Sequence, residues 1–509
     1  MIRRFAALSS LAGWRRFLVL VLCGAVAALA LPPLDIFPAF FIAFALAFRV
    51  MEGARSLPQA FIDGWGLGSG YFAVAFHWIG FAFLVEADTY LWMMPFAVGG
   101  LALSMAIYWG LAALVAHITG WRGLARYLVL AAALAIAEWL RGHLFTGFPW
   151  AAPGQAAEGL GAVLQIASVV GMTGLTVLMF VWSAACANLT VRRGRHTALA
   201  LLALLPLAGA WGAYRLADSA PASASGPLVR IVQPNIPQDD KWRGENGRAI
   251  LDTLLDLSRG DGAAAKAVIW PESALPFALD ESQTALSEIS AMLGREGTLI
   301  AGSLRRSGGK IFNSVQFVDG SGAISATYDK WRLVPGGEFL PFESILEPLG
   351  FRRVVTVPGS FQAGNGPVTI TADGLPPVTP SVCYEAVFPH RFVDRGNRPQ
   401  WIANVTNDAW FGNSTGPHQH LAQLRLRAIE QGIPAFRAAN TGISAIIDPY
   451  GRYLARLKTG VTGFIERPLP AALSATPYAR YGDWIFLVLT VVTVLAAAAL
   501  RNHFPRESS

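Results

Sequence analysis

Long apolar stretches, separated by short polar breaks, make up most of the first 220 residues. A stretch of about 20 apolar residues is long enough to cross the hydrocarbon layer of a membrane as a helix. Such stretches recur near residues 17–33, 36–51, 64–85, 90–118, 124–141, 160–190 and 196–216, and one more, 484–500, stands alone near the C-terminus. The pattern predicts a multi-pass membrane bundle of about eight transmembrane helices.

Arginine is concentrated in every second break between these stretches. Short loops rich in lysine and arginine stay in the cytoplasm, so the N-terminus and each even-numbered loop are expected there. The long segment between the seventh and eighth stretches then lies on the extracytoplasmic side. A cleaved signal peptide is an alternative for the first 30 residues, because Ala28-Leu29-Ala30 resembles a cleavage site, and it leaves that segment on the same side. The basic residues are Arg3, Arg4, Arg15, Arg16, Arg49, Arg55, Arg122, Arg126, Arg192, Arg193, Arg195, Arg501 and Arg506.

From about residue 227 short β-branched runs alternate with helical periodicity. Such a mixture predicts a layered α/β domain. We therefore expect a membrane bundle of seven helices over residues 1–220, a globular domain over 221–470, and a last helix with a cytoplasmic tail over 471–509. The expected strands are 228–232, 267–270, 299–301, 314–318, 324–328, 378–383, 401–406 and 443–447, with helices near 245–259, 281–294 and 418–432.

Composition agrees with a membrane protein. Charged residues are 14% of the 509, hydrophobic residues are 53%, and the mean hydropathy is +0.43, which excludes a disordered or collagen-like chain. The net charge of +7 comes from scattered arginines rather than a basic stripe, so no nucleic-acid partner is expected. The sequence has no Gly-x-x-x-x-Gly-Lys-Ser/Thr phosphate loop, so no nucleotide is expected either.

Only one of the three cysteines is a candidate for chemistry. Cys23 and Cys186 sit inside apolar runs, where a thiol usually packs as a small hydrophobe. Cys383 ends the strand expected at 378–383, and its domain holds no second cysteine with which it could pair. Because a lone thiol on an oxidising outer face is a liability unless it is used, we interpret Cys383 as a nucleophile.

Two further reactive side chains also follow expected strands. Glu272 comes after 267–270, and Lys330 comes after 324–328. A thiol needs a base within hydrogen-bonding reach and a nearby cation, and Glu272 and Lys330 suit these roles. Structural explanations stay open for each: an acid near a helix start, a solvated strand end and a buried thiol.

The residues resemble a known family. Trp270-Pro271-Glu272, Lys330 and Cys383-Tyr384-Glu385 are similar to the ordered Glu, Lys, Cys pattern of the carbon-nitrogen hydrolase (nitrilase) superfamily. Over nearly the whole chain the sequence resembles the membrane branch of that superfamily, the apolipoprotein N-acyltransferases. Its further hallmarks are residues 233–238 with Lys241-Trp242, 335–341, 407–411 and 432–437 with 440–442.

The resemblance implies an αββα sandwich on the periplasmic side of the bacterial inner membrane and a triad of Glu272, Lys330 and Cys383. It implies transfer of a fatty acyl chain from a phospholipid to the α-amino group of a diacylglyceryl-cysteine apolipoprotein, through a thioester on Cys383. A thioester keeps the acyl group activated, so no cofactor is expected. Supporting or substrate-binding roles are implied for Trp242, Glu338, Tyr384 and Glu385.

Several alternatives deserve weighing. Gly412-Asn-Ser414-Thr-Gly416 has the spacing of a serine nucleophile elbow but lacks an acid and a histidine at suitable positions downstream, so we interpret Ser414 or Thr415 as a helix cap. His418 and His420 would point to different helix faces without carboxylate companions, so no metal site is expected. A membrane-anchored amidase that uses water as acceptor, and a transporter or receptor with a ligand-binding outer domain, remain open.

Glu138 and Arg141 lie three residues apart near the end of the fifth apolar stretch. Residues at this spacing share one helix face and can pair. Charges inside a membrane segment indicate either a function or a pair that locks the bundle. The sequence leaves both interpretations open.

Overall fold

The computed structural model describes residues 11–85, 87–218, 226–261, 264–340, 343–348 and 361–501. The chain divides into two compact units. The first comprises Met1–Gly80, Asp88–Ser219 and Ala475–Ser509, and the second comprises Phe81–Ala87 and Ala220–Ser474. Seven residues that precede the long helix α6 in sequence thus group with the globular unit.

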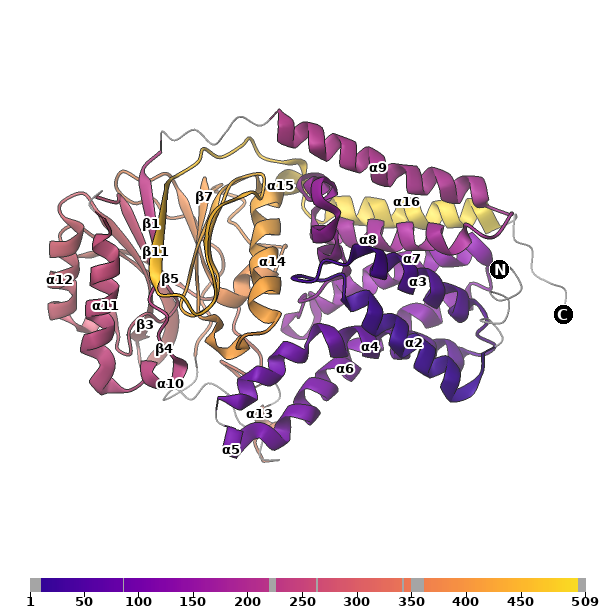
Figure 1. The fold of residues 1–509 in the computed structure, drawn as a ribbon, viewed down its shortest axis with the longest axis horizontal. Coiled ribbons are helices and arrows are strands. Elements are labelled where there is room, and N and C mark those ends of the chain that lie inside the picture. Colours follow the sequence, from indigo (N-terminus) through magenta and orange to yellow (C-terminus); the bar gives the residue numbers. More distant parts are fainter. Residues whose placement is uncertain are drawn as a thin grey trace. The chain divides into compact units, whose positions relative to one another are not determined.

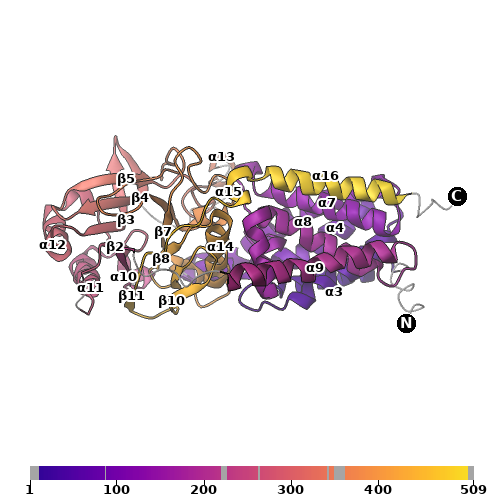
Figure 2. The ribbon, with the colours of Figure 1, turned by 90° about the horizontal axis from the view of Figure 1, so that it is seen from above.

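The first unit is helical, and its longer helices run side by side (Figures 1 and 2). Its α-helices are α2 (Gly13–Ala28), α3 (Phe37–Glu52), α4 (Leu57–Ala75), α5 (Ala87–Tyr90), α6 (Met94–Ile118), α7 (Gly123–Arg141), α8 (Ala167–Asn188), α9 (Arg195–Ala217), α15 (Pro477–Tyr481) and α16 (Trp484–Leu500). Short 3₁₀ segments are η1 (His77–Leu84), η2 (Leu91–Met93), η3 (Leu144–Thr146) and η4 (Pro153–Ile166).

Several of these helices are apolar and long enough to cross a membrane. Within the described residues there are four such helices, or five if the bent pair α4 and η1 forms one span with a 46° bend. Helix α16 is apolar but shorter. The chain therefore has a membrane region of about four to five candidate spans. The four helices cover Ala87–Ile118, Gly123–Arg141, Pro153–Asn188 and Arg195–Ala217.

Polar contacts join several helix ends to one another. The guanidinium of Arg16, in the first turn of α2, lies 2.6 Å from the carboxylate of Asp63 on α4. The backbone N–H of Gly123, at the start of α7, donates to Glu52 at the end of α3 over 2.6 Å. Arg49, near the same end of α3, donates to a backbone oxygen near the end of α8. The basic breaks of the sequence therefore come together at one end of the helical unit.

Glu138 and Arg141 form a buried ion pair on α7. Trp109 of α6 donates its indole N–H to Glu138 over 2.7 Å, and Arg141 donates to the backbone oxygen of Trp150 over 3.0 Å. Both charges thus find partners within the helical unit, which favours a role in locking the bundle.

The second unit contains two β-sheets. One has six strands in the order β11-β1-β2-β3-β4-β5, and the other has five in the order β10-β9-β8-β7-β6. The strands of the first are β1 (Leu228–Gln233), β2 (Ala267–Trp270), β3 (Thr298–Ser307), β4 (Lys310–Asp319), β5 (Ile324–Asp329) and β11 (Gly463–Pro468). Those of the second are β6 (Val378–Val382), β7 (Trp401–Thr406), β8 (Ala435–Ala439), β9 (Ser444–Ile447) and β10 (Tyr453–Leu457).

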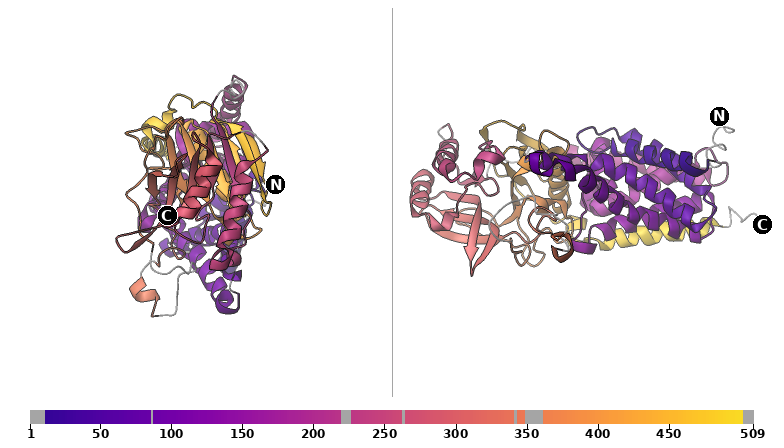
Figure 3. Two further views of the ribbon diagram at one scale, coloured as in Figure 1. Left: turned by 90° about the vertical axis from the view of Figure 1, so that its left-hand side faces the viewer. Right: turned by 90° about the horizontal axis from the view of Figure 1, so that it is seen from below.

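Three apolar cores arrange this unit in layers. The central core combines residues of both sheets, such as Ile269 and Phe317 from one and Val405 and Phe436 from the other. A second core joins the first sheet to helices α11 (Gly247–Arg259) and α12 (Gln283–Leu293), and a third joins the second sheet to α14 (Gly416–Gln431). The result is a helix–sheet–sheet–helix sandwich, visible in Figure 1 and from further sides in Figure 3.

The expected elements of this unit are present with small shifts of their ends. Strands 267–270 and 401–406 have the expected bounds, whereas β3 and β4 form a longer hairpin than expected. Strands β8, β10 and β11 were not expected. Short elements complete the unit: α10 (Gln238–Lys241), α13 (Glu343–Leu346), η5 (Gly244–Asn246), η6 (Leu279–Glu281), η7 (Cys383–Val387) and η8 (Asp408–Phe411).

Candidate active site

The sheet topology brings the reactive residues to one edge. Strand β2 is parallel to β3, and β5 also runs parallel to β3 because both are antiparallel to β4. Glu272 and Lys330, which follow β2 and β5, therefore leave the first sheet at the same edge. In the second sheet, β6 and β7 are parallel and are followed by Cys383 and Asn407. The backbone N–H of Asn407 donates to Oε2 of Glu272 over 2.8 Å, which joins the two edges.

Lys330 lies between two carboxylates. Its Nζ is 3.2 Å from Oε1 of Glu272 and 2.9 Å from Oε1 of Glu338, and all three side chains are buried. Asn313 donates its side-chain amide to the same two oxygens, over 2.7 and 3.0 Å. The second oxygen of Glu338 accepts the backbone N–H of Val334 over 2.8 Å. The site thus holds one cation and two carboxylates in a fixed arrangement.

The backbone around Glu272 requires a close approach to the neighbouring strand. A Cβ on Gly302 of β3 would lie 2.4 Å from the backbone oxygen of Pro271 and 2.5 Å from the Cα of Glu272. Only glycine leaves room there. Lys241, which is fully buried, donates its Nζ to the backbone oxygen of Glu272 over 3.0 Å. Two neighbours therefore fix the position of this carboxylate.

Cys383 has an unusual backbone conformation. It is the first residue after β6, and its φ of 48° falls in the left-handed region, which costs a residue other than glycine about 1–2 kcal/mol. Strain of this kind persists only where surrounding contacts hold it, and it is often found at functional sites. The conformation turns the chain sharply from strand to 3₁₀ helix and presents the thiol at the sheet edge.

The pKa of the Cys383 thiol is raised. Burial is the main cause, the charge of Glu272 adds to it, and Lys330 and a hydrogen bond with Thr406 act in the opposite direction. Lys330 acts in the expected direction, toward the thiolate, but burial outweighs it in the resting site. The thiol keeps its proton until a base removes it, and Glu272 and Lys330 are both close enough to act on its charge.

Lys330 remains an ammonium. Burial alone would lower its pKa, but the negative charges of Glu272 and Glu338 raise it above its ordinary value. A buried cation that cannot easily lose its proton is suited to hold a developing oxyanion rather than to act as a base.

The remaining residues expected at the site lie around this centre. Glu385 is buried, and its Oε1 accepts the phenolic hydroxyl of Tyr328 and the backbone N–H of Trp331, over 2.7 and 2.8 Å. Burial raises the pKa of Glu385 to about 7, against the lowering effect of these hydrogen bonds. Tyr384 is buried with its ring 5.0 Å from that of Phe388. The ring centre of Trp242 lies 5.7 Å from Nζ of Lys241, the neighbour of Glu272.

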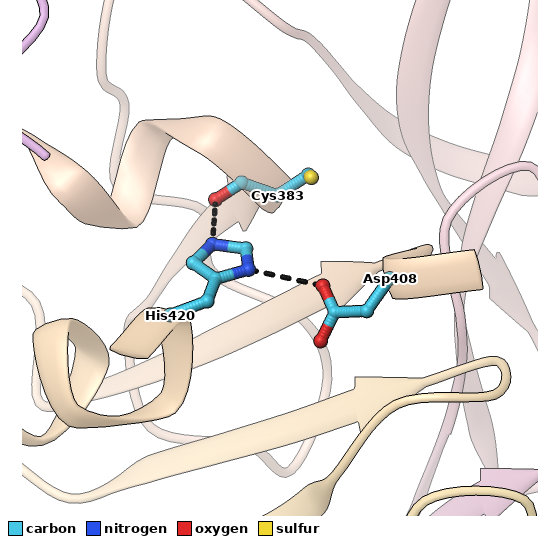
Figure 4. Close-up of side chains that lie close together, drawn as sticks. All are labelled: Cys383, Asp408 and His420. Atoms are coloured by element: carbon cyan, nitrogen blue, oxygen red, sulfur yellow. Dashed lines mark hydrogen bonds and ion pairs between the residues drawn. The ribbon is translucent and has the colours of Figure 1, made fainter. Parts of the chain in front are cut away.

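A second buried cluster lies behind Cys383. His420 of α14 approaches the backbone oxygen of Cys383 with Nε2 over 2.9 Å and Asp408 with Nδ1 over 3.0 Å, as Figure 4 shows. Arg437 of β8 lies 2.6 Å from Asp408 and 3.1 Å from Nδ1 of His420. The expectation that His420 lacks a carboxylate companion is therefore wrong, because β7 and α14 bring Asp408 to it from a separate loop.

The donor atoms of this cluster are a poor fit for a metal ion. A ring nitrogen of His420, the sulfur of Cys383 and a carboxylate oxygen of Asp408 lie within 4.8 Å of one another. However, both ring nitrogens and both carboxylate oxygens already have partners, and the fixed charge of Arg437 lies beside them and would repel a cation.

A cavity of about 540 Å³ lies beside the end of β7, within the second unit. Its wall combines Leu84 and Val85, from the segment Phe81–Ala87, with Gln238, Asp408 and Asn413. Gly412 has a φ of 55°, and a Cβ there would lie 2.4 Å from the ring of Phe81. This segment of the first half of the sequence is thus packed tightly against the loop that follows Asp408.

The structure brings Glu272, Lys330 and Glu338 into contact, with Cys383 near Glu272 and Lys330 and with Glu385 bonded to the backbone of Val382. No sequence pattern pointed to Asn313, which lies within a strand, or to Asp408, His420 and Arg437 as a cluster. Knowledge of how β3 pairs with β4 would have pointed to Asn313 as a site residue, because Asn313 stands opposite Leu304 near the end of β3. His420 could be noticed in the sequence, but its partners Asp408 and Arg437 come from other elements of the fold.

Comparisons with known proteins give a consistent result. Residues 228–478 match the carbon-nitrogen hydrolase family model, and residues 23–185 match the model of the apolipoprotein N-acyltransferase N-terminal domain. An apolipoprotein N-acyltransferase of Rhodopseudomonas palustris is 40% identical, with 97% of this chain and 96% of the relative covered. One of Bradyrhizobium diazoefficiens is 42% identical, with 96% of each covered. Among solved structures, an amidase from Nesterenkonia sp. is 20% identical over 48% of this chain and 91% of its own, with a TM-score of 0.36.

Proposed function

Because the chain belongs to the apolipoprotein N-acyltransferase family, we propose that it transfers a fatty acyl chain from a phospholipid to the α-amino group of the N-terminal diacylglyceryl-cysteine of apolipoproteins. It is an N-acyltransferase with a nitrilase-like domain and apolar membrane helices. The observation that carries the chemistry is the position of Lys330 between Glu272 and Glu338, with Cys383 close enough to feel the charge of Glu272 and of Lys330.

In the first step, Cys383 attacks an ester carbonyl of the phospholipid. Glu272 takes the thiol proton as the C–S bond forms, which is needed because the resting thiol is protonated. Lys330 donates to the oxyanion of the tetrahedral intermediate. The C–O bond then breaks, the proton passes to the departing alkoxide, and a lysophospholipid leaves a thioester on Cys383.

In the second step, the neutral α-amine of the acceptor attacks the thioester. Glu272 takes a proton from the amine, the C–N bond forms, and the C–S bond breaks. The proton returns to the sulfur, so the free enzyme is restored without a nucleotide or another cofactor. Glu338 is proposed to orient Lys330, because its Oε1 accepts from the ammonium over 2.9 Å.

Glu385, Trp242 and Tyr384 are proposed to support the reaction in different ways. Glu385 ties the Cys383 turn to the Lys330 loop, because it accepts from the backbone of both Val382 and Trp331. Trp242 and Tyr384 are proposed to contact substrate beside these loops.

We place the enzyme in the bacterial inner membrane with eight crossings, and with the catalytic domain in the periplasm. The basic loops support this topology, because contacts at one end of the helical unit join the start of α2 with the ends or starts of α3, α4, α7 and α8. In Figures 1 and 2, α16 ends at the same end of that unit at which α2 begins. An even number of crossings places the start of the first helix and the end of the last helix on the same side of the membrane. The proposed parts are residues 1–220, 221–470 and 471–509.

Intact-mass spectrometry of the purified protein with phospholipid alone tests the route. We expect a mass increase equal to one acyl chain, which hydroxylamine removes and which Cys383→Ser lacks. If no acylated species forms while the folded enzyme still converts lipopeptide, the thioester route is wrong.

A second incubation separates the rival functions. With phospholipid and a diacylglyceryl lipopeptide, the enzyme should form the amide, whereas release of fatty acid without amide would indicate hydrolysis with water as acceptor. A transporter or receptor would keep its function in Cys383→Ala, in which the acyltransferase should lose all activity while the melting temperature is preserved.

A further inference from the structure

From the geometry behind the nucleophile we infer that His420 is a positioning residue, which holds the backbone of Cys383 in its left-handed conformation through a hydrogen bond to the Cys383 carbonyl oxygen. This inference rests on the proposed role of Cys383 as the nucleophile. It assigns a task to a buried imidazole that the proposed chemistry of Glu272 and Lys330 does not use.

The direction of the hydrogen bond follows from its partners. Nε2 of His420 lies 2.9 Å from the carbonyl oxygen of Cys383. Because a carbonyl oxygen can only accept a hydrogen bond, Nε2 must carry the proton. Nδ1 lies 3.0 Å from Oδ1 of Asp408 and 3.1 Å from the guanidinium of Arg437. These contacts hold the ring in place, and the Cys383 carbonyl oxygen itself requires the proton on Nε2.

Burial and the neighbouring Arg437 lower the pKa of His420, while Asp408 acts in the opposite direction. Burial would raise the pKa of Asp408, but the charge of Arg437 above all, together with a hydrogen bond from Thr406, lowers it. Arg437 is itself anchored, since its other terminal nitrogen donates to Asn404 over 2.8 Å. All four side chains are fully buried, so the arrangement is rigid.

The ring is not arranged to act as the base. A base for the thiol would direct a free nitrogen lone pair at the sulfur. Here Nε2 is used on the carbonyl oxygen, Nδ1 faces Arg437 and Asp408, and Figure 4 shows the sulfur pointing away from the ring. His420 acts on the backbone of Cys383 instead, at the residue whose φ of 48° has to be held.

Two substitutions at this position separate the positioning role from a structural one. In His420→Gln the terminal amide extends to about the place of Nε2 and can still donate to the Cys383 carbonyl. In His420→Asn the shorter amide reaches only the place of Nδ1, so it keeps contacts with Asp408 and Arg437 but loses the bond to Cys383. His418→Ala, at an exposed position on the same helix, is the matched control.

The readout is the rate at which iodoacetamide alkylates Cys383, followed by mass spectrometry of the peptide that carries it. We expect His420→Asn to alkylate about tenfold or more slowly than His420→Gln, with melting temperatures within a few degrees of each other. Thioester formation from phospholipid should fall in parallel. Equal rates in the two variants, or rates that simply follow the melting temperature, would overturn the inference. A loss of a thousandfold or more in His420→Gln would also overturn it, because it would identify the ring as the base.

Alkylation requires no lipid, so this experiment is independent of the acyl-transfer proposal. If the unaltered enzyme never forms a thioester but the two variants differ in alkylation, the positioning role stands and the proposed route fails. If His420→Asn does not fold, His420→Leu replaces it, because leucine fills a similar space and has no hydrogen-bond donor for the Cys383 carbonyl. Slower alkylation in that variant supports the inference, and an unchanged rate overturns it.

Discussion

Asn313 donates its side-chain amide to Oε1 of Glu272 and so holds the proposed base within reach of Lys330. The bond is 2.7 Å long, and both residues are buried. Asn313 comes from β4 of the β3–β4 hairpin, whereas Glu272 follows β2, two strands earlier in the chain. The orientation of the proposed base thus depends on the register of β3 with β4.

Asn313→Ala should slow thioester formation by about 10- to 100-fold. The loss of a donor to a buried charge is worth about 1–3 kcal/mol, and each 1.4 kcal/mol is a factor of ten in rate. Single-turnover acylation with phospholipid measures the effect. Asn313→Asp, which adds a third carboxylate to the pair, should be slower still, and an aspartate variant as fast as the native enzyme would contradict the assignment.

Lys330→Met should reduce acylation by about 100- to 1000-fold, because it removes an oxyanion donor worth roughly 3 kcal/mol. It should also destabilise the protein by about 3–5 kcal/mol, because two buried carboxylates lose their cation. Adding Glu338→Gln to Lys330→Met removes one of these two buried negative charges. The double variant should therefore regain melting temperature without regaining rate, whereas recovery of both would show that Lys330 acts only on stability.

The raised pKa of Glu385 predicts that the free energy of unfolding depends on pH. Its pKa is about 7 in the folded protein, against an ordinary value of 4.5. A folded-state pKa above the unfolded one means that the native state binds the proton more tightly between these values, so the stabilisation is complete below pH 4.5 and is lost as the pH rises through about 7. The total is about 3 kcal/mol. Thermal melts from pH 4.5 to 8 should show this loss in the native enzyme.

Glu385→Gln is the control for that measurement. The amide cannot titrate, so the part of the slope that Glu385 contributes should vanish. The variant should also be less stable at low pH, because its NH₂ group would face the backbone N–H of Val382, which now donates to Oε2 over 2.7 Å. A difference between the two melting curves that does not change with pH would show that Glu385 does not titrate in this range.

Gly442→Ala should disturb the cluster behind Cys383. A Cβ at this position would lie 2.4 Å from Oδ2 of Asp408, the oxygen that Arg437 holds. We expect slower alkylation of Cys383 together with a lower melting temperature. Gly463→Ala, whose Cβ would have 3.9 Å of room, is the matched control. Native alkylation rates in Gly442→Ala would show that Asp408 can shift without consequence for the thiol.

Glu138→Gln tests the membrane pair. Arg141 would keep its bond to the backbone oxygen of Trp150 but would lose its buried counter-charge. The expected loss is about 3–5 kcal/mol of stability, with an unchanged rate of Cys383 alkylation in the fraction that remains folded. A lower alkylation rate at native stability would instead point to a functional role for the pair.

The sequence predicted the strands that deliver Glu272, Lys330 and Cys383 because each is a short run with β-branched or aromatic residues shortly before a reactive residue, although only β2 and β6 are fully buried. Strand β8 was missed because Ala435-Phe-Arg-Ala-Ala lacks that signature, and β10 and β11 were missed because they are only partly buried. Residue spacing also cannot reveal which side chains meet across two sheets. Asp408 and His420 are 12 positions apart, and only the packing of α14 on the second sheet brings them together.

The chemistry of the thiol was the other point that sequence could not supply. The motifs indicated a base and a cation near Cys383, but they could not show that burial outweighs the effect of Lys330 and raises the pKa of the thiol. The extent of burial depends on the whole domain, so no motif could have given the sign of this shift.

The inclusion of Phe81–Ala87 in the globular unit has a practical consequence. A protein engineer who expressed residues 221–470 alone, to obtain a water-soluble catalyst, would discard two side chains that line the cavity next to Asp408, together with the ring that packs on Gly412. Such a fragment would expose the surface that these three apolar side chains cover. A detachable version of the enzyme would need that short peptide grafted back, by a linker or by circular permutation.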